Sequence, residues 1–151
     1  MMTTQLPLPT ARLYEQDFQL WLAKTVQSLR DGKLLEVDYE NLIEELENMG
    51  RSEKNALKSN LRILLMHLLK YQHQPEKRSN SWRFTITEHR QRITDSLETS
   101  PSLKLFLEAE FENCYQKARR LAADETGLPQ NTFPTNAQFS SVEVLDQDYL
   151  P

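Results

Sequence analysis

The sequence is poor in cysteine and glycine, and it contains no long apolar run. A single cysteine, Cys114, among 151 residues excludes an internal disulfide bond and a metal site built from cysteines alone. Three glycines are too few for a phosphate-binding loop or a dinucleotide fingerprint. No apolar run approaches the roughly 18 residues of a membrane-spanning helix, and residues 1–10 lack the pattern of a secretory signal. We therefore expect a cytoplasmic globular protein with no membrane association.

Apolar side chains recur every three or four residues along most of the chain, which predicts helices. The expected fold class is all-α, an antiparallel bundle of four main helices at about 11–30, 39–73, 79–98 and 100–125, where either Ser79 or Ser81 begins the third helix. Residues 1–10 are expected to be a flexible arm and residues 11–127 the helical bundle domain. Residues 128–151 are expected to be a tail packed on the bundle, with a short helix that Ser140 and Glu143 open as a capping box.

Glycine, proline and serine mark where these helices begin and end. The residues expected to end the first, second and fourth helices are Gly32, Pro75 and Gly127. Ser100 followed by Pro101 predicts the N-cap and the first residue of the fourth helix. Gly50 interrupts the second helix, so two helices joined near Gly50 are the alternative. We favour one helix, because an interior glycine costs only about 1 kcal/mol relative to alanine.

Charge is distributed unevenly along the chain. Residues 1–50 have a net charge of -5, residues 51–92 of +7, and residues 93–151 of -6. The basic block could form an anion-binding face for nucleic acid or for an acidic partner. We favour the alternative, in which basic helices pack beside acidic ones and each neutralises the other. We therefore do not expect nucleic-acid binding.

No arrangement typical of a catalytic or metal site is present in the sequence. The positions three before each histidine hold no carboxylate, and no His-Glu-x-x-His run occurs, so the di-iron and zinc-protease patterns are missing. Cys114 could pair with His67 or His89, but its helix face predicts a core residue. Glu40, Glu44 and Glu47 could hold a cation through waters, although a solvated face is favoured. We assign no catalytic residue, no cofactor and no metal.

Several short motifs together resemble one protein family. They are Tyr14-x-x-Asp17-Phe18-x-x-Trp21, Asp38-Tyr39-Glu40-Asn41-Leu42-Ile43-Glu44-Glu45, Met49-Gly50-Arg51-Ser52-Glu53, His67-Leu68-Leu69-Lys70-Tyr71-Gln72, Arg78-Ser79-x-Ser81-Trp82, and Glu125-Thr126-Gly127-Leu128-Pro129. Over about residues 12–151 the chain is similar to the bacterial domain-of-unknown-function family twenty-nine, which is common in cyanobacteria. The resemblance implies a small, cytoplasmic, α-helical protein and implies no reaction.

The motifs draw attention to a candidate polar cluster. Its members are Asp17, Asn41, Glu44, His67, Arg78 and Arg90. Our leading hypothesis is a non-enzymatic protein-interaction or regulatory module, whose partner is an unknown protein or a second copy of the chain. The alternative is an enzyme or nucleic-acid-acting protein that uses His67, Arg78 and Arg90. A buried polar cavity would favour the enzyme, whereas a closed apolar core with an exposed apolar patch would favour the module.

Antiparallel pairing of neighbouring helices also predicts specific contacts. Asp17 is expected to contact Arg51 or a residue one turn away, and Trp21 is expected to lie beside Glu47. Between the second and third helices, His67 is expected opposite Ile86. Burial in that seam predicts a neutral His67 that is hydrogen-bonded to an acceptor and is not a metal ligand.

Overall fold

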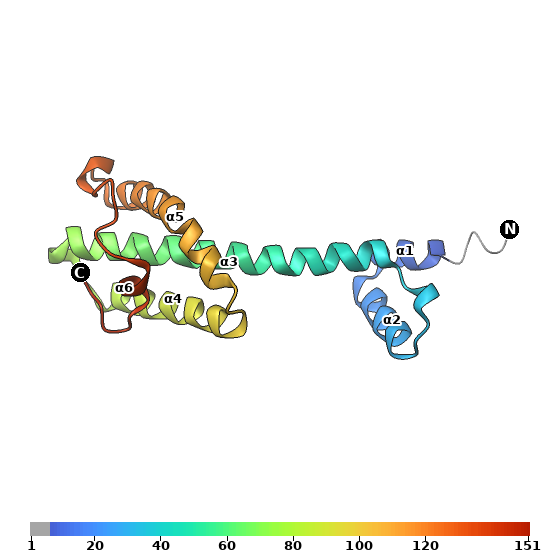
Figure 1. Cartoon of the computed structure of the whole chain (residues 1–151). Coiled ribbons are helices and arrows are strands. Elements are labelled where there is room, and N and C mark those ends of the chain that lie inside the picture. The colour runs from blue at the N-terminus through green and yellow to red at the C-terminus, as the bar shows by residue number, and fades with distance from the viewer. Residues whose placement is uncertain (1–6) are drawn as a thin grey trace. The chain divides into compact units, whose positions relative to one another are not determined.

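The computed structural model describes residues 7–151, and it confirms the all-α class. Its helices are α1 (Pro7–Gln16), α2 (Phe18–Arg30), α3 (Tyr39–His73), α4 (Asn80–Thr99), α5 (Leu103–Thr126) and α6 (Ser141–Leu145), with no strand among these residues (Figure 1). The chain divides into two compact units, Met1–Arg51 and Ser52–Pro151, here termed the N-terminal and C-terminal units. This division differs from the single domain expected over 11–127. Of the expected arm, residues 1–6 lie outside the described residues, and residues 7–10 belong to α1.

The helix expected over 11–30 is in fact two helices, because Asp17 interrupts it. Its backbone leaves the helical region (φ -150°, ψ 88°), and its side chain accepts a hydrogen bond from the Leu20 amide at 3.0 Å. An aspartate that caps a following turn competes with helix continuation in this way. The rings of Tyr14, Phe18 and Trp21 pack across the break, with centroids 4.9 to 5.8 Å apart. Gly32 follows α2 with φ 70°, as expected for a glycine that ends a helix.

The prediction of one helix over 39–73 is confirmed, and the alternative break at Gly50 is wrong. α3 continues through Gly50, where an added Cβ would meet no atom within 4 Å. The position is exposed, so glycine costs only its backbone entropy there. The boundary between the two units falls within α3, after Arg51.

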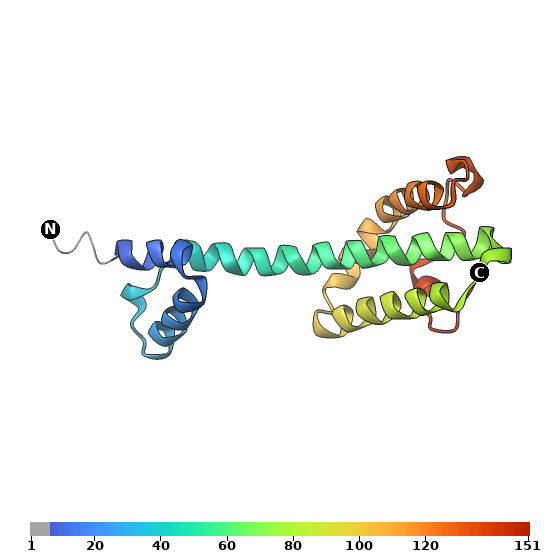
Figure 2. The same cartoon turned by 180° about the vertical axis from the view of Figure 1, so that it is seen from behind.

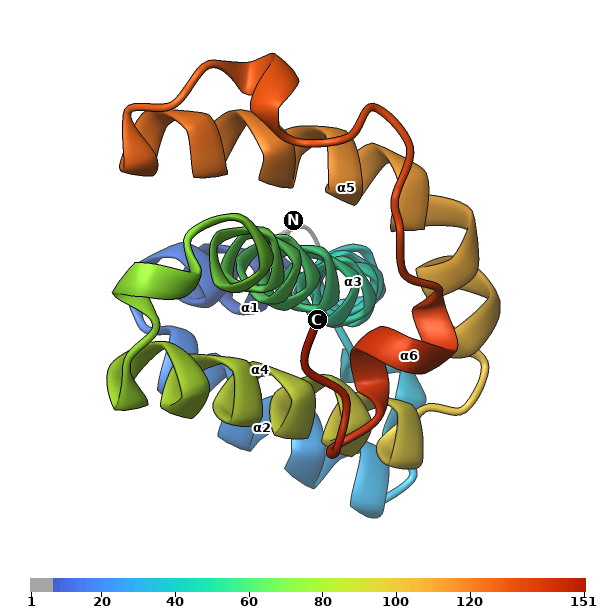
Figure 3. The same cartoon turned by 90° about the vertical axis from the view of Figure 1, so that its left-hand side faces the viewer.

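In the C-terminal unit, the last part of α3 lies between α4 and α5 (Figure 3). Figure 2 shows these helices from behind the view of Figure 1. Apolar residues from all three helices and the tail form one core. Its eighteen buried members are Leu57, Leu61, Leu64, Leu65, Met66, Leu68, Leu69, Ile86, Ile93, Leu103, Leu107, Cys114, Tyr115, Ala118, Ala122, Phe133, Phe139 and Val144. Because this segment has a neighbour on each side, α3 buries the consecutive runs 64–66 and 68–70 and not only residues at steps of three and four.

The helix ends of the C-terminal unit mostly follow their sequence signals. The Ser79 side chain caps α4 through the Trp82 amide, and Gly127 ends α5 with φ 75°. The expected cap at Ser100 is wrong, because α5 begins at Leu103 after a turn through Pro101. The Ser100 hydroxyl instead donates to Glu53 of α3 at 3.0 Å. Proline here precedes the helix and makes the turn that reverses the chain.

The tail after α5 crosses to α4 and contributes to the core (Figure 3). Ser140 and Glu143 form the capping box of α6, in which each side chain accepts from the other residue's amide. Phe133, Phe139 and Val144 are buried against the three long helices. The tail is therefore an integral part of the C-terminal unit's core.

Candidate functional site

The six polar candidates are divided between the units, and each has a partner of its own. Asp17, Asn41 and Glu44 belong to the N-terminal unit. Asp17 caps α2, the Asn41 amide donates to Asp38 at 2.7 Å, and Glu44 forms an exposed ion pair with Arg51 at 3.9 Å. These contacts join residues at most seven positions apart, about two helix turns, which makes them local structural contacts.

The contacts of α1 and α2 with α3 differ from the predicted ones. Asp17 makes no ion pair with Arg51, and Trp21 Nε1 donates to Asp38 at 3.2 Å instead of lying beside Glu47. Tyr14 donates its hydroxyl to Glu45, which raises the pKa of Tyr14 to about 12. The expectation assumed a straight helix over 11–30, and the bend at Asp17 moves Trp21 to the start of α3.

His67 has the predicted contact with an acceptor but is not among the buried core residues. It is half-buried, and its Nδ1 lies 3.0 Å from the Ile63 carbonyl one turn earlier. Burial lowers the pKa of His67, and the neighbouring Lys70 charge lowers it further against the raising effect of the carbonyl. Among residues 7–151, no group of three His, Cys, Asp or Glu side chains could hold a metal ion.

Lys70 is the residue of this region that sequence reasoning did not single out. Its side chain is only 4% exposed, and Nζ lies 2.7 Å from Glu125 of α5 and 4.6 Å from the Trp82 ring centroid of α4. The ammonium therefore links all three helices, and its hydrogen bond lowers the pKa of Glu125. A signal existed, because Lys70 stands at a core position of an otherwise apolar run. A buried lysine requires such a partner.

Arg78 and Arg90 hold the tail through its backbone carbonyls. Arg90 is 1% exposed and donates to the Val144 carbonyl at 2.6 Å and to that of Tyr149. Arg78 donates to the Tyr71 carbonyl at 2.8 Å and to that of Pro151 at 3.3 Å. Of the expected neutralisation between helices, the C-terminal unit shows one ion pair that joins two helices, Lys70 with Glu125. The buried Arg90 is satisfied by carbonyl oxygens instead.

Cys114 is placed as a core residue. It is buried, its Sγ lies 3.8 Å from the Lys58 carbonyl, and burial raises the pKa of the thiol. A nucleophilic cysteine requires the opposite shift, which a neighbouring cation or a helix N-terminus provides. The geometry therefore favours the packing role over a pair with His67 or His89.

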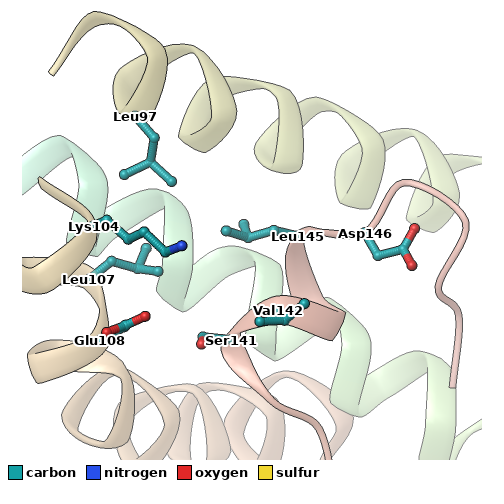
Figure 4. Close-up of a pocket in the computed structure, with 8 residues that line it drawn as sticks. All are labelled: Leu97, Lys104, Leu107, Glu108, Ser141, Val142, Leu145 and Asp146. Atoms are coloured by element: carbon teal, nitrogen blue, oxygen red, sulfur yellow. The ribbon is translucent and has the colours of Figure 1, made fainter. Parts of the chain in front are cut away.

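Two surface cavities of the C-terminal unit have volumes near 400 Å³, and a smaller one of about 280 Å³ lies beside Arg62 and Leu121. One of about 400 Å³ lies between α4, α5 and α6, where Leu97, Leu107 and Leu145 form apolar walls beside Lys104 (Figure 4). The other, of about 390 Å³, is polar and lies around Arg78 at the start of α4. His67 and Arg90 line neither, so these cavities do not join the polar candidates into one site.

The N-terminal unit presents an exposed apolar stripe on α3. The stripe consists of Tyr39, Ile43, Leu46 and Met49, which are 47, 55, 57 and 67% exposed. Their spacing of three and four places them on one helix face. The periodicity of this segment predicts a face packed in the bundle, but these four side chains stay exposed among the described residues of the unit.

A comparison with protein-family models identifies the family of the chain. The model described as "Domain of unknown function DUF29" matches residues 13–150, almost the whole chain. The protein belongs to the DUF29 family. No curated protein and no solved structure matches it. Within residues 7–151 of this DUF29 protein, no helix combines the length and the apolar character needed to cross a bilayer.

Proposed function

We propose that this DUF29 protein is a non-enzymatic interaction module that binds another protein through the stripe of Tyr39, Ile43, Leu46 and Met49. The observation that carries the proposal is the exposure of these four side chains on one face of α3. Contiguous exposed apolar surface is typical of a binding site, whereas single exposed apolar residues are ordinary.

The contrast between the units supports this function. Among residues 12–51 only Trp21, Thr25 and Val37 are buried, whereas ten large apolar side chains are exposed. The C-terminal unit has a closed core of eighteen residues and five such exposed side chains. Full burial of a large apolar side chain yields about 1.5–3 kcal/mol. A partner that covers the stripe would therefore gain binding energy that the isolated unit does not use.

The alternative, an enzyme or nucleic-acid-acting protein using His67, Arg78 and Arg90, has less support. All three side chains are hydrogen-bonded to backbone carbonyls of the protein itself. A general acid or a phosphate-binding arginine needs free donors directed at a ligand, and a general base needs a free lone pair there. We therefore propose that the partner is a protein and not a nucleic acid. We place the interaction in the cytoplasm, because a free thiol such as that of Cys114 stays reduced there.

Site-specific photo-crosslinking in cells that make the protein tests this function. A photoreactive amino acid replaces Leu46, and the matched control carries it at Leu105 of α5, which is 76% exposed. We expect a discrete protein adduct from position 46 that position 105 does not give. Equal adducts from both positions, or none from position 46, would contradict the proposed role of the stripe.

A further inference from the structure

We infer that the partner presents a basic amphipathic helix to the stripe. This inference rests on the proposed function and specifies the chemistry of the partner. It follows from two properties of the same helix surface, the geometry of its apolar residues and the charge along its edge.

The geometry of the stripe suits a helix of moderate length. Tyr39 to Met49 covers about 15 Å along α3 at 1.5 Å per residue, close to three turns. Partner helices that dock on apolar surfaces use anchors at steps of three and four, and two or three such turns supply them. Three turns of an amphipathic helix therefore match the stripe in both length and spacing.

Acidic side chains line one edge of the stripe. Glu40 and Glu47 stand three residues before and four residues after Ile43, so both are its neighbours on the helix surface. They are exposed together with Glu44. Residues 1–51 as a whole contain nine acidic and five basic side chains, of which Arg51 is paired with Glu44. A partner helix with lysine or arginine beside its apolar face would complement this edge.

A second copy of the chain fits the same surface poorly. A symmetric antiparallel pair of α3 segments would place Glu40 and Glu47 of one copy along the acidic edge of the other. Like charges brought together at an interface are unfavourable and are a common device against self-association. An anionic membrane or nucleic acid would meet the same repulsion. Charge complementarity thus selects a cationic helix.

The test uses the full chain and three fluorescently labelled peptides of about 18 residues, a length at which helices become stable. The first has a leucine stripe flanked by lysines, the second the same stripe flanked by glutamates, and the third the first composition in scrambled order. Fluorescence anisotropy measures binding at low and moderate salt. We expect the lysine-flanked peptide to bind at least about tenfold tighter than both others, and salt to weaken it.

Substitutions in the protein locate the binding. Ile43→Ala and Leu46→Ala remove the anchors while keeping a strong helix former, and each should weaken the lysine-flanked peptide about tenfold. The double variant Glu40→Gln/Glu47→Gln should weaken it severalfold and reduce its salt dependence. The matched controls Leu105→Ala and Glu108→Gln on α5, both exposed, should leave it unchanged.

Each other outcome separates the two proposals. Equal binding of both amphipathic peptides, with loss in Leu46→Ala, would overturn the basic partner and leave the interaction stripe intact. Binding of the scrambled peptide, or no effect of Ile43→Ala, would overturn the basic helix at this stripe, and the crosslinking experiment then decides the proposed function. Sedimentation that shows a dimer abolished by Leu46→Ala would make a second copy the occupant instead.

Discussion

The two units share the helical periodicity of α3, but its apolar face is buried in one unit and exposed in the other. In the C-terminal unit, α4, α5 and the tail cover the apolar face of α3, and its buried apolar residues between Leu57 and Leu69 belong to the core. In the N-terminal unit, the apolar positions Tyr39, Ile43, Leu46 and Met49 of the same helix stay exposed. An apolar stripe therefore predicts that one face of a helix is buried against a partner. The partner can be another segment of the chain or a different molecule.

The largest expected effect tests whether the C-terminal core carries the stability. Leu68→Ala removes a fully buried side chain and should lower the free energy of unfolding by about 2–5 kcal/mol. Leu46→Ala, the matched change on the stripe, should alter it by about 0.5 kcal/mol or less. Urea denaturation followed by circular dichroism measures both. A loss for Leu46→Ala as large as that for Leu68→Ala would erase the distinction between the two faces of α3.

Removal of the Arg90 guanidinium tests how the tail is held in the C-terminal unit. Arg90→Met keeps the apolar stem but leaves the carbonyls of Val144 and Tyr149 without their donor. We expect about 1–3 kcal/mol lower stability and faster amide exchange over residues 141–149. Arg92→Met is the control, because Arg92 is exposed and pairs only with Glu88 in its own helix. Unchanged exchange in the tail would show that the apolar anchors alone retain it.

The sequence predicted those features that depend on local signals. Period, caps and helix-ending residues located α3, α4, α5 and the α6 capping box, because each signal acts within a few residues. Asp17 shows the limit of this reasoning: its position in an apolar pattern favoured helix, while its side chain could also cap the next one. Helix continuation and capping by Asp17 compete at this position. Tertiary packing of the Tyr14, Phe18 and Trp21 rings decides the competition, and the helix breaks.

Features that depend on long-range packing were not predictable in the same way. The contacts of Trp21 with Asp38 and of Arg90 with Val144 join segments whose register no local pattern encodes. The candidate polar residues were chosen from motifs, and sequence alone could not show that each one is bonded to its own surroundings. Lys70 could have been noticed, because a lysine at a core position implies a buried partner, but Glu125 is 55 residues away.

A smaller effect comes from pH and belongs to the C-terminal unit. Burial lowers the pKa of His67 in the folded protein, so the unfolded chain binds its proton first as pH falls. Stability due to this group is therefore complete above its ordinary pKa of about 6.5 and declines as pH falls below it. His67→Gln should cost modest stability at pH 7.5 and flatten the slope between about pH 6.5 and 5. Thermal unfolding across pH measures this.

The pH dependence of the His67→Gln variant also shows which titratable group causes the slope. Glu125, whose pKa Lys70 lowers, loses its contribution only below about pH 4.5, so the two groups act in separate windows. A slope above pH 5 that survives His67→Gln would assign it to another group, with His73 the next candidate because burial lowers its pKa too. Elemental analysis should find the same metal content in both proteins. Stoichiometric metal lost with His67 would favour the enzyme alternative.

The smallest effect probes the point where the units meet in the sequence. Gly50 is helical and exposed, one residue before the end of the N-terminal unit, and an added Cβ meets no atom within 4 Å. Gly50→Ala should therefore raise the free energy of unfolding by about 0.5–1 kcal/mol, because alanine lowers the entropy of the unfolded chain and keeps the helix. Gly127→Ala is the opposing control, since φ 75° at that position disfavours a side chain by about 1–2 kcal/mol. Calorimetry of the two variants beside the parent protein measures both signs. If Gly50→Ala is destabilising, α3 bends at Gly50, and the stripe and the C-terminal core belong to two helices instead of one.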